Sequence, residues 1–213
     1  MRTHFSYGRR TSAYPPQIVK LMEIARSAFP ETLIAIYTNG ILLSKMDSTF
    51  WQSCHDNNIR IMITAYPIKL DVQAIKNAVK KFGVTLAWTS ATDAAIMDAS
   101  FIVNPIDISG SGDIVKSFAF CHDPNKCITL KHGKLYPCAF TAHVNHFSKY
   151  FGIDIPITEA DCIDIYNASG GDKVLEKLAQ PIPACKYCSG GRFTESSRKI
   201  KWHRSERDIS EWV

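Results

Sequence analysis

The sequence lacks a long apolar run and an apolar segment near its start. No stretch of about 18 consecutive apolar residues occurs, so we expect no membrane-spanning helix. The first residues also lack the apolar core of a secretory signal peptide, which argues against export. We therefore expect a cytoplasmic protein in a reducing compartment. The number of cysteines is seven, and an odd number fits reduced thiols or metal ligands better than a disulfide framework.

The charge distribution lacks the signature of a nucleic-acid-binding protein. The formal net charge is +5, but the basic residues gather in residues 192–207 without the interleaving of aromatic and basic side chains that lines a nucleic-acid groove. We expect this segment to be a solvated face. The chain has 213 residues, of which 46% are hydrophobic, and this suffices for one sizeable core or two small ones.

The first half of the chain alternates between amphipathic and continuous apolar segments. Helices are predicted over residues 15–29, 42–55 and 71–82, and strands over residues 33–37, 59–64 and 84–88. Continuous apolar strands are typical of a parallel sheet that is covered on both faces. This repetition predicts an α/β fold, as a parallel sheet or a partial (β/α) barrel, with functional loops at the carboxyl ends of the strands.

After residue 106 the pattern changes to a Gly-rich loop, a hairpin, short helices and cysteines. Residues 128–138 predict two short strands around a turn at Gly133, and residues 107–113 predict an interdomain turn. The expected organisation has three parts. Residues 1–14 form an unstructured or non-native leader, residues 15–106 form the β/α part, and residues 107–213 form a small α+β domain rich in cysteine.

Five cysteines in the second half have the spacing of a metal or iron–sulfur site. Cys185 and Cys188 form a C-x-x-C loop, which supplies two thiolates from one tight turn. A soft metal centre needs about four thiolates, and the hairpin ending at Cys138 could bring that residue together with Cys121 or Cys127. This pattern predicts a metal–thiolate centre.

Other candidate residues have simpler interpretations. We expect Cys54 and Cys162 to be small buried core residues. His143 and His146 lie three apart on a predicted helix and could face one site, but such histidines are more often surface or core residues. Asp161 also lies three residues from Asp164, a spacing more typical of helix or turn polar groups than of an acid pair.

The sequence resembles the C-terminal portion of radical S-adenosylmethionine (SAM) proteins that carry a twitch or SPASM-like extension. The likeness rests on Thr38-Asn39-Gly40 after an apolar strand, the later strands, the Gly-rich linker and the cysteine module, and it covers most of the chain from about Gln17. In that superfamily the extension has a cysteine, a spacer, a glycine, a shorter spacer and a second cysteine. Here eleven residues separate Cys121 from Gly133, and four separate Gly133 from Cys138. The twitch version closes with a C-x-x-C.

The resemblance implies an auxiliary 4Fe–4S cluster bound by four cysteines. These are Cys121, Cys138, Cys185 and Cys188, with Cys127 as an alternative to Cys121. A cluster with four cysteine ligands has no open iron, so it would carry single electrons or anchor the small domain.

The sequence departs from the family at its start. It has no C-x-x-x-C-x-x-C motif, and Tyr7-Gly8-Arg9-Arg10 stands where similar proteins have Gly-Gly-Glu. We therefore expect an N-terminally truncated or degenerate copy without independent catalysis, in which SAM binding belongs only to an intact homologue. The partners implied are a missing N-terminal half or a redox protein.

Two other classes of function stay open. The same thiolates could hold Zn²⁺ as a structural Cys₄ clip, although the 46 residues between Cys138 and Cys185 exceed the usual spacing of zinc ribbons and favour iron. A metal-free interaction module is the third possibility. Its sheet edge, exposed where barrel strands are missing, predicts self-association.

Overall fold

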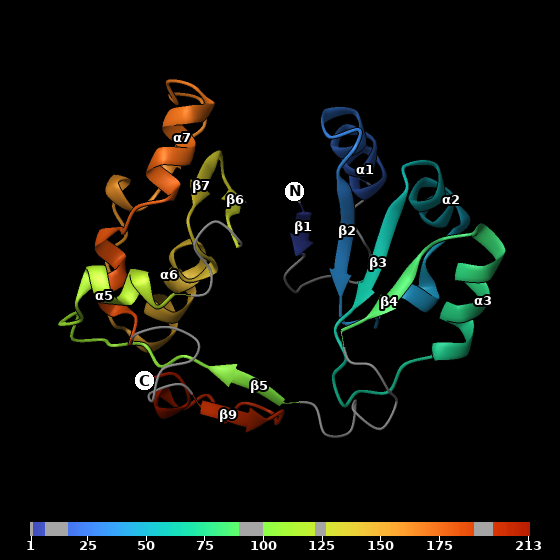
Figure 1. Cartoon of the computed structure of the whole chain (residues 1–213). Coiled ribbons are helices and arrows are strands. Elements are labelled where there is room, and N and C mark those ends of the chain that lie inside the picture. Colours follow the sequence, from blue (N-terminus) through green and yellow to red (C-terminus); the bar gives the residue numbers. More distant parts are fainter. Residues whose placement is uncertain (1, 7–16, 90–99, 122–126, 190–197) are drawn as a thin grey trace. The chain divides into compact units, whose positions relative to one another are not determined.

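A computed structural model describes residues 2–6, 17–89, 100–121, 127–189 and 198–213 (Figure 1). It divides into two compact units, Met1–Ala99 and Ser100–Val213, and its class is mixed α/β, as predicted. In the described part of the chain, none of the helices has the length and apolar character needed to cross a bilayer.

The first unit is a parallel sheet with helices between successive strands. Its elements are β1 (Arg2–Ser6), α1 (Gln17–Ala28), β2 (Leu33–Thr38), the 3-10 helix η1 (Leu43–Lys45), α2 (Ser48–Asp56), β3 (Ile59–Ile63), α3 (Val72–Phe82) and β4 (Leu86–Trp88). The strands lie in the order β1-β2-β3-β4, and each neighbouring pair is parallel. The predicted helix–strand alternation is therefore confirmed as a parallel sheet, with β1 and β4 at its edges.

Two sequence predictions differ from the structure of this unit. Residues 2–6 belong to the predicted leader but form β1, because β2 offers their backbone a parallel partner from Arg2–Leu33 to Ser6–Tyr37. The helix predicted over residues 42–55 is two elements, η1 and α2. It breaks at Asp47, which has an extended backbone and whose carboxylate accepts a hydrogen bond from Phe50 N at 2.9 Å as the N-cap of α2.

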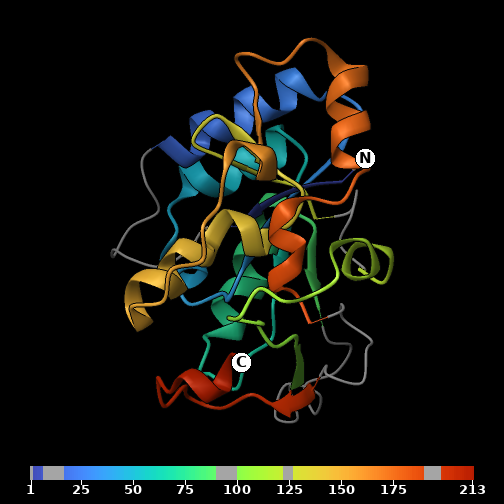
Figure 2. The same ribbon diagram turned by 90° about the vertical axis from the view of Figure 1, so that its left-hand side faces the viewer.

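The core of the first unit lies between one face of the sheet and the three helices. Ile59, Ile61 and Ile63 are buried at alternate positions of β3 and pack with residues of the helices, among them Trp51 and Ile75. The helices α1 and α2 lie side by side (Figure 2). The alternation of β3 directs every second side chain into this apolar cluster.

The second unit is built from short elements. They are β5 (Ser100–Val103), α5 (Ile114–Ala119), β6 (Thr129–Lys131), β7 (Lys134–Tyr136), α6 (Ala139–Phe151), η2 (Glu159–Asp161), β8 (Ile163–Asp164), α7 (Gly171–Leu178), η3 (Pro183–Tyr187), β9 (Arg198–Lys201) and η4 (Ile209–Glu211). The predicted hairpin is confirmed as β6 and β7, which β8 extends to three antiparallel strands. β5 pairs with β9, so residues 100–103 lie in the second unit, ahead of the boundary predicted after residue 106.

Candidate metal centre

Four cysteines of the second unit line one cavity of about 120 Å³. They are Cys121, Cys138, Cys185 and Cys188. Phe140, Ile182 and Tyr187 contribute apolar parts of the wall. The four residues that the sequence nominates as ligands therefore meet in space, although they come from three separate segments of the chain.

Each cysteine is delivered by the end of a helix or by a tight turn. Cys121 follows α5, and its N–H donates to Phe118 O at 3.1 Å. Cys138 is the N-cap residue of α6, and Thr141 Oγ1 donates to its carbonyl at 2.9 Å. Cys185 lies in η3, and the N–H of Cys188 closes that turn by donating to Cys185 O at 3.1 Å. All four side chains are partly exposed.

The C-x-x-C turn is held by the segment that runs from Ile106 to Ser117. The Ser117 hydroxyl donates to Cys188 O at 3.0 Å, and Gly112 N donates to Lys186 O at 3.1 Å. An added Cβ on Gly112 would lie 2.6 Å from Lys186 O, so this close approach requires glycine. Ile106 also pairs with Cys188 as an isolated β-bridge.

The Gly-rich loop predicted as an interdomain turn lies inside the second unit and packs on the C-x-x-C turn. Asp107 N donates to Tyr187 O at 2.9 Å, while the Asp107 carboxylate accepts hydrogen bonds from Ser109 and Ser111. The Ser109 hydroxyl, helped by the bonds from Ser111, lowers the pKa of the Asp107 carboxyl. The loop thus acts as a support for the cysteine cavity.

Asp161 anchors the C-x-x-C turn from its other end. It is fully buried, with 0% exposure. Its Oδ1 accepts from Ala184 N at 2.7 Å, one residue before Cys185, and its Oδ2 accepts from Thr158 N at 2.8 Å and Thr158 Oγ1 at 2.9 Å. Asp164 instead accepts from Tyr166 N within its own loop. The two aspartates therefore serve different segments and do not form an acid pair.

The pKa values of two thiols that line the cavity are raised above their ordinary value. Burial raises the pKa of Cys138, and to a smaller extent the Cys188 thiolate does so too. Burial also raises the pKa of Cys185, with smaller contributions of the same sign from Cys138, Cys188 and Asp161. The thiolate forms need a positive charge to balance them, so metal binding at these cysteines would release protons.

The donor set and the size of the cavity suit a metal–thiolate group. Four thiols are the ligands that iron–sulfur clusters and structural zinc use. A volume of about 120 Å³ is roughly ten times the 10–15 Å³ that one water needs, which leaves room for a group larger than a single ion. In their present positions, no three His, Cys, Asp or Glu side chains of the described residues form a group that could hold a metal ion. Binding would therefore draw the cysteines closer.

One further polar side chain of the cavity wall is Asn104. Its Oδ1 is buried and has no hydrogen-bond partner in the described part of the chain. Such orphaned buried groups are rare in folded proteins. An unpaired side-chain oxygen on a residue of the wall is consistent with a site that receives a polar or charged group.

The remaining candidate cysteines lie elsewhere. Cys127 is exposed and lies outside the cavity lining, so the described structure brings Cys121, and not its alternative, to the other three. Cys54 and Cys162 are buried, as predicted. Burial raises the pKa of Cys54 to about 12, and its thiol contacts Met22 Sδ at 3.7 Å, as expected for an inert core residue.

The two candidate histidines lie together on α6 but outside the lining of the cysteine cavity. The rings of His143 and His146 stack with centroids 6.2 Å apart. Burial lowers the pKa of His143, and the charges of Lys131 and His146 lower it further. The structure therefore gives no support to histidine ligands at the cysteine site.

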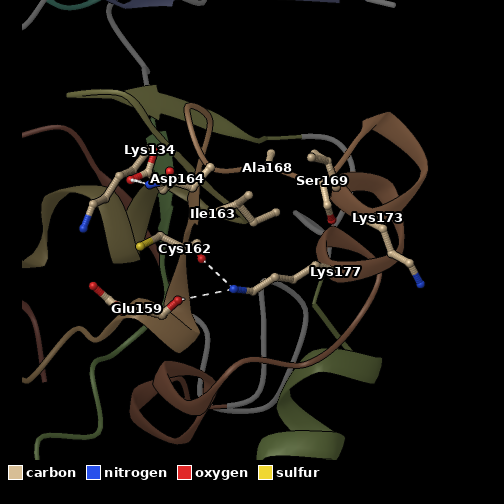
Figure 3. Close-up of a pocket in the computed structure, with 11 residues that line it drawn as sticks. Lys134, Glu159, Cys162, Ile163, Asp164, Ala168, Ser169, Lys173 and Lys177 are labelled. Atoms are coloured by element: carbon tan, nitrogen blue, oxygen red, sulfur yellow. Dashed lines mark hydrogen bonds between the residues drawn. The ribbon is translucent and has the colours of Figure 1, made fainter.

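A second cavity, of about 360 Å³, lies between β8 and α7 (Figure 3). Lys177 spans it and donates to Cys162 O at 2.8 Å and Glu159 O at 3.3 Å. The ammonium groups of Lys134 and Lys173 point away from one another in Figure 3. These lysines do not converge on a common anion, and the contacts of Lys177 fasten η2 to α7.

Comparison with known proteins adds no identification. No protein-family model matches the sequence, and a search of the curated proteins finds no match. The resemblance to radical SAM proteins therefore stays a prediction based on the cysteine spacing and the Thr-Asn-Gly loop.

Proposed function

We propose that the second unit binds an auxiliary 4Fe–4S cluster through Cys121, Cys138, Cys185 and Cys188, and that the chain is a cluster-binding protein related to the radical SAM enzymes. The observation that carries this proposal is that all four cysteines line one cavity. Their separation in the sequence makes a chance meeting of the four nominated residues a poor explanation, because structural cysteines are buried one by one like other small apolar residues.

The residues of the chain would bind and shield the cluster. The turn of Cys185 and Cys188 is fixed at one end by Asp161 and at the other by Ser117, which limits the rearrangement that ligation requires. Apolar groups such as Phe140 and Ile182 would keep water from the centre. A cluster with four thiolate ligands supplies one-electron transfer or structural support and leaves no open coordination position for substrate.

The fold of the first unit is consistent with a relation to the radical SAM enzymes. Its strands are parallel, helices connect them, and the helices pack on the face of the sheet that carries Ile61. We infer that this sheet is a segment of a (β/α) barrel, in which a ring of helices covers the outer face of the strands. Thr38-Asn39-Gly40 then lies at the carboxyl end of a barrel strand, where barrels of this class place their functional loops.

Anaerobic reconstitution with iron and sulfide tests the proposal. We expect about four irons and four sulfides per chain, with a thiolate-to-iron absorption band and an electron paramagnetic resonance signal after reduction. The double variant Cys185→Ala/Cys188→Ala should lose both metal and signal. Cys127→Ala is the matched control, because that cysteine lies outside the cavity lining, and it should retain both.

The alternatives give different results in the same experiment. One tightly bound zinc per chain, with no iron signal, would make the cavity a structural clip. Absence of any stoichiometric metal would refute a metal centre. Loss of the cluster in Cys127→Ala, with retention in Cys121→Ala, would reassign the fourth ligand.

A further inference from the structure

Asn104 has a fixed position on the wall of the cysteine cavity. The residues that follow it are tied to the C-x-x-C turn. Ser189 Oγ donates to Pro105 O at 2.5 Å, and Ile106 pairs with Cys188. Ile106 N also donates to Trp212 O at 2.7 Å. The segment that directly follows Asn104 is therefore fastened beside Cys188.

The side-chain oxygen of Asn104 is buried without a hydrogen-bond partner, although the residue as a whole is only half-buried. Its Oδ1 is buried and accepts no hydrogen bond from any described residue. Two other polar side chains of the same wall already make hydrogen bonds. Ser117 donates to Cys188 O, and Thr141 donates to Cys138 O. The Oδ1 atom of Asn104 is left unpaired on a residue that lines the cavity, and a buried polar atom without a partner costs stability unless a ligand satisfies it.

The chemistry of an amide identifies the partner that it suits. A half-turn about its last side-chain bond exchanges the carbonyl oxygen for the NH₂ group, so the same position can donate. The sulfurs of thiolates and of iron–sulfur clusters are hydrogen-bond acceptors that carry negative charge. Such bonds are among the factors that set the reduction potential of a cluster.

We propose that the Asn104 amide donates a hydrogen bond to a sulfur of the metal–thiolate centre. This inference rests on the proposed function. Asn104 binds no metal itself, and its role is to position and stabilise the sulfur ligands. Because the positive end of the N–H dipole faces the sulfur, the amide stabilises the more negative, reduced state and raises the reduction potential of the centre.

The test compares two buried polar groups that lack partners. Asn104→Leu removes the amide from the cavity wall. Ser148→Ala removes a buried hydroxyl on α6 that also has no partner among the described residues but lies outside the cavity lining. Both metal-free variants should melt at a temperature no lower than that of the unmodified protein, because each loses an unsatisfied group.

The two variants should differ once metal is present. In Asn104→Leu the affinity for Co²⁺, followed by its thiolate-to-metal absorption, should fall about ten- to a hundredfold. The midpoint potential of the reconstituted cluster should become more negative. Ser148→Ala should change neither quantity. Asn104→Ala, which removes the amide without adding bulk or charge, should lose Co²⁺ affinity like the leucine variant.

The outcomes separate this inference from the function on which it rests. An unchanged potential with unchanged Co²⁺ affinity in Asn104→Leu would overturn the role of Asn104 while leaving the metal centre intact. If the leucine variant does not fold, retention of full Co²⁺ affinity in Asn104→Ala would overturn it. A parent protein that binds neither Co²⁺ nor a cluster would refute the proposed function and this inference together.

Discussion

The two units of this chain are stabilised in different ways. Among the described residues, the apolar cluster of the first unit has 14 buried members, whereas that of the second has three, Val144, Ile155 and Tyr187. Of the buried polar residues in the described ranges, Ser53 belongs to the first unit, and Ser117, Thr141 and Asp161 belong to the second. Apolar burial is more extensive in the first unit, whereas buried polar residues lie mainly in the second, around the cysteine cavity.

This difference indicates that the proposed metal centre would stabilise the second unit. The second unit also buries apolar side chains outside its apolar cluster, such as Ile163, Leu178 and Ile182, and a bound metal would add stability by linking three segments of the unit. Ser117 and Thr141 both hydrogen-bond the backbone of cavity cysteines, so these buried polar residues and the centre belong to one framework. We expect the stability of the first unit not to depend on metal, because the helices and strands among its described residues bury one another.

Metal loading should have the largest effect, and it should act on one unit. At free metal a hundred times above the dissociation constant, we expect the second unit to gain about 2.7 kcal/mol in free energy of unfolding. Hydrogen exchange measured by mass spectrometry would show slower exchange in η3 and α6, with β3 as the internal control. Equal slowing of exchange in both units would contradict a stabilisation confined to the second unit.

The same stabilisation should depend on pH. Burial raises the pKa values of Cys138 and Cys185, and metal binding must displace their protons. The gain from metal should therefore shrink as the pH falls and grow as the pH rises towards the thiol pKa values. A gain that does not change with pH would argue against thiolate ligands.

Asp161→Asn should have the next largest effect. The amide cannot accept all three hydrogen bonds that the carboxylate takes from Thr158 and Ala184, and a buried donor would be left unpaired. We expect a loss of about 2 kcal/mol in the stability of the second unit, measured by urea denaturation followed through hydrogen exchange. Asp164→Asn is the matched control. Its partners lie in its own loop, so a loss as large there would contradict the special role of Asp161.

Gly112→Ala should lower the stability of the second unit by less than Asp161→Asn does, and it should clearly weaken Co²⁺ binding. The new Cβ would lie 2.6 Å from Lys186 O and would push the C-x-x-C turn away, at a cost of about 1 kcal/mol or more. At Gly171, the first residue of α7, an added Cβ meets nothing within 4 Å. Gly171→Ala should therefore stabilise the chain by about 0.5–1 kcal/mol without changing Co²⁺ affinity. The sign of the two changes in melting temperature checks this contrast.

The sequence predicts those features that depend on local patterns. The apolar run at residues 33–37 and the Gly133 hairpin both form the expected strands, since periodicity and turn residues act over short distances. The break at Asp47 was missed because an N-cap inside an apolar pattern looks like an ordinary polar position. Strand β1 was missed because its pairing is decided by a partner about thirty residues away.

The candidate site was also predicted in part, where its residues follow a local sequence pattern. The C-x-x-C and the spacing to Cys138 point to the four cysteines that share the cavity, because paired thiolates have restricted spacings. Asp161 and Asn104 could not be found in this way. Their importance comes from burial and from contacts with distant segments, and no local residue pattern encodes either of these.

The closure of the cavity also has a consequence for biosynthesis. The hydrogen bond between Ser189 and Pro105 joins residues 84 positions apart, and the bond between Ser117 and Cys188 joins residues 71 apart. During translation the first unit can fold while the C-x-x-C turn is still being made, since domains generally fold in the order in which they emerge. The four cysteines can therefore meet only after Cys188 has been synthesised, and the metal site can be completed only late in synthesis.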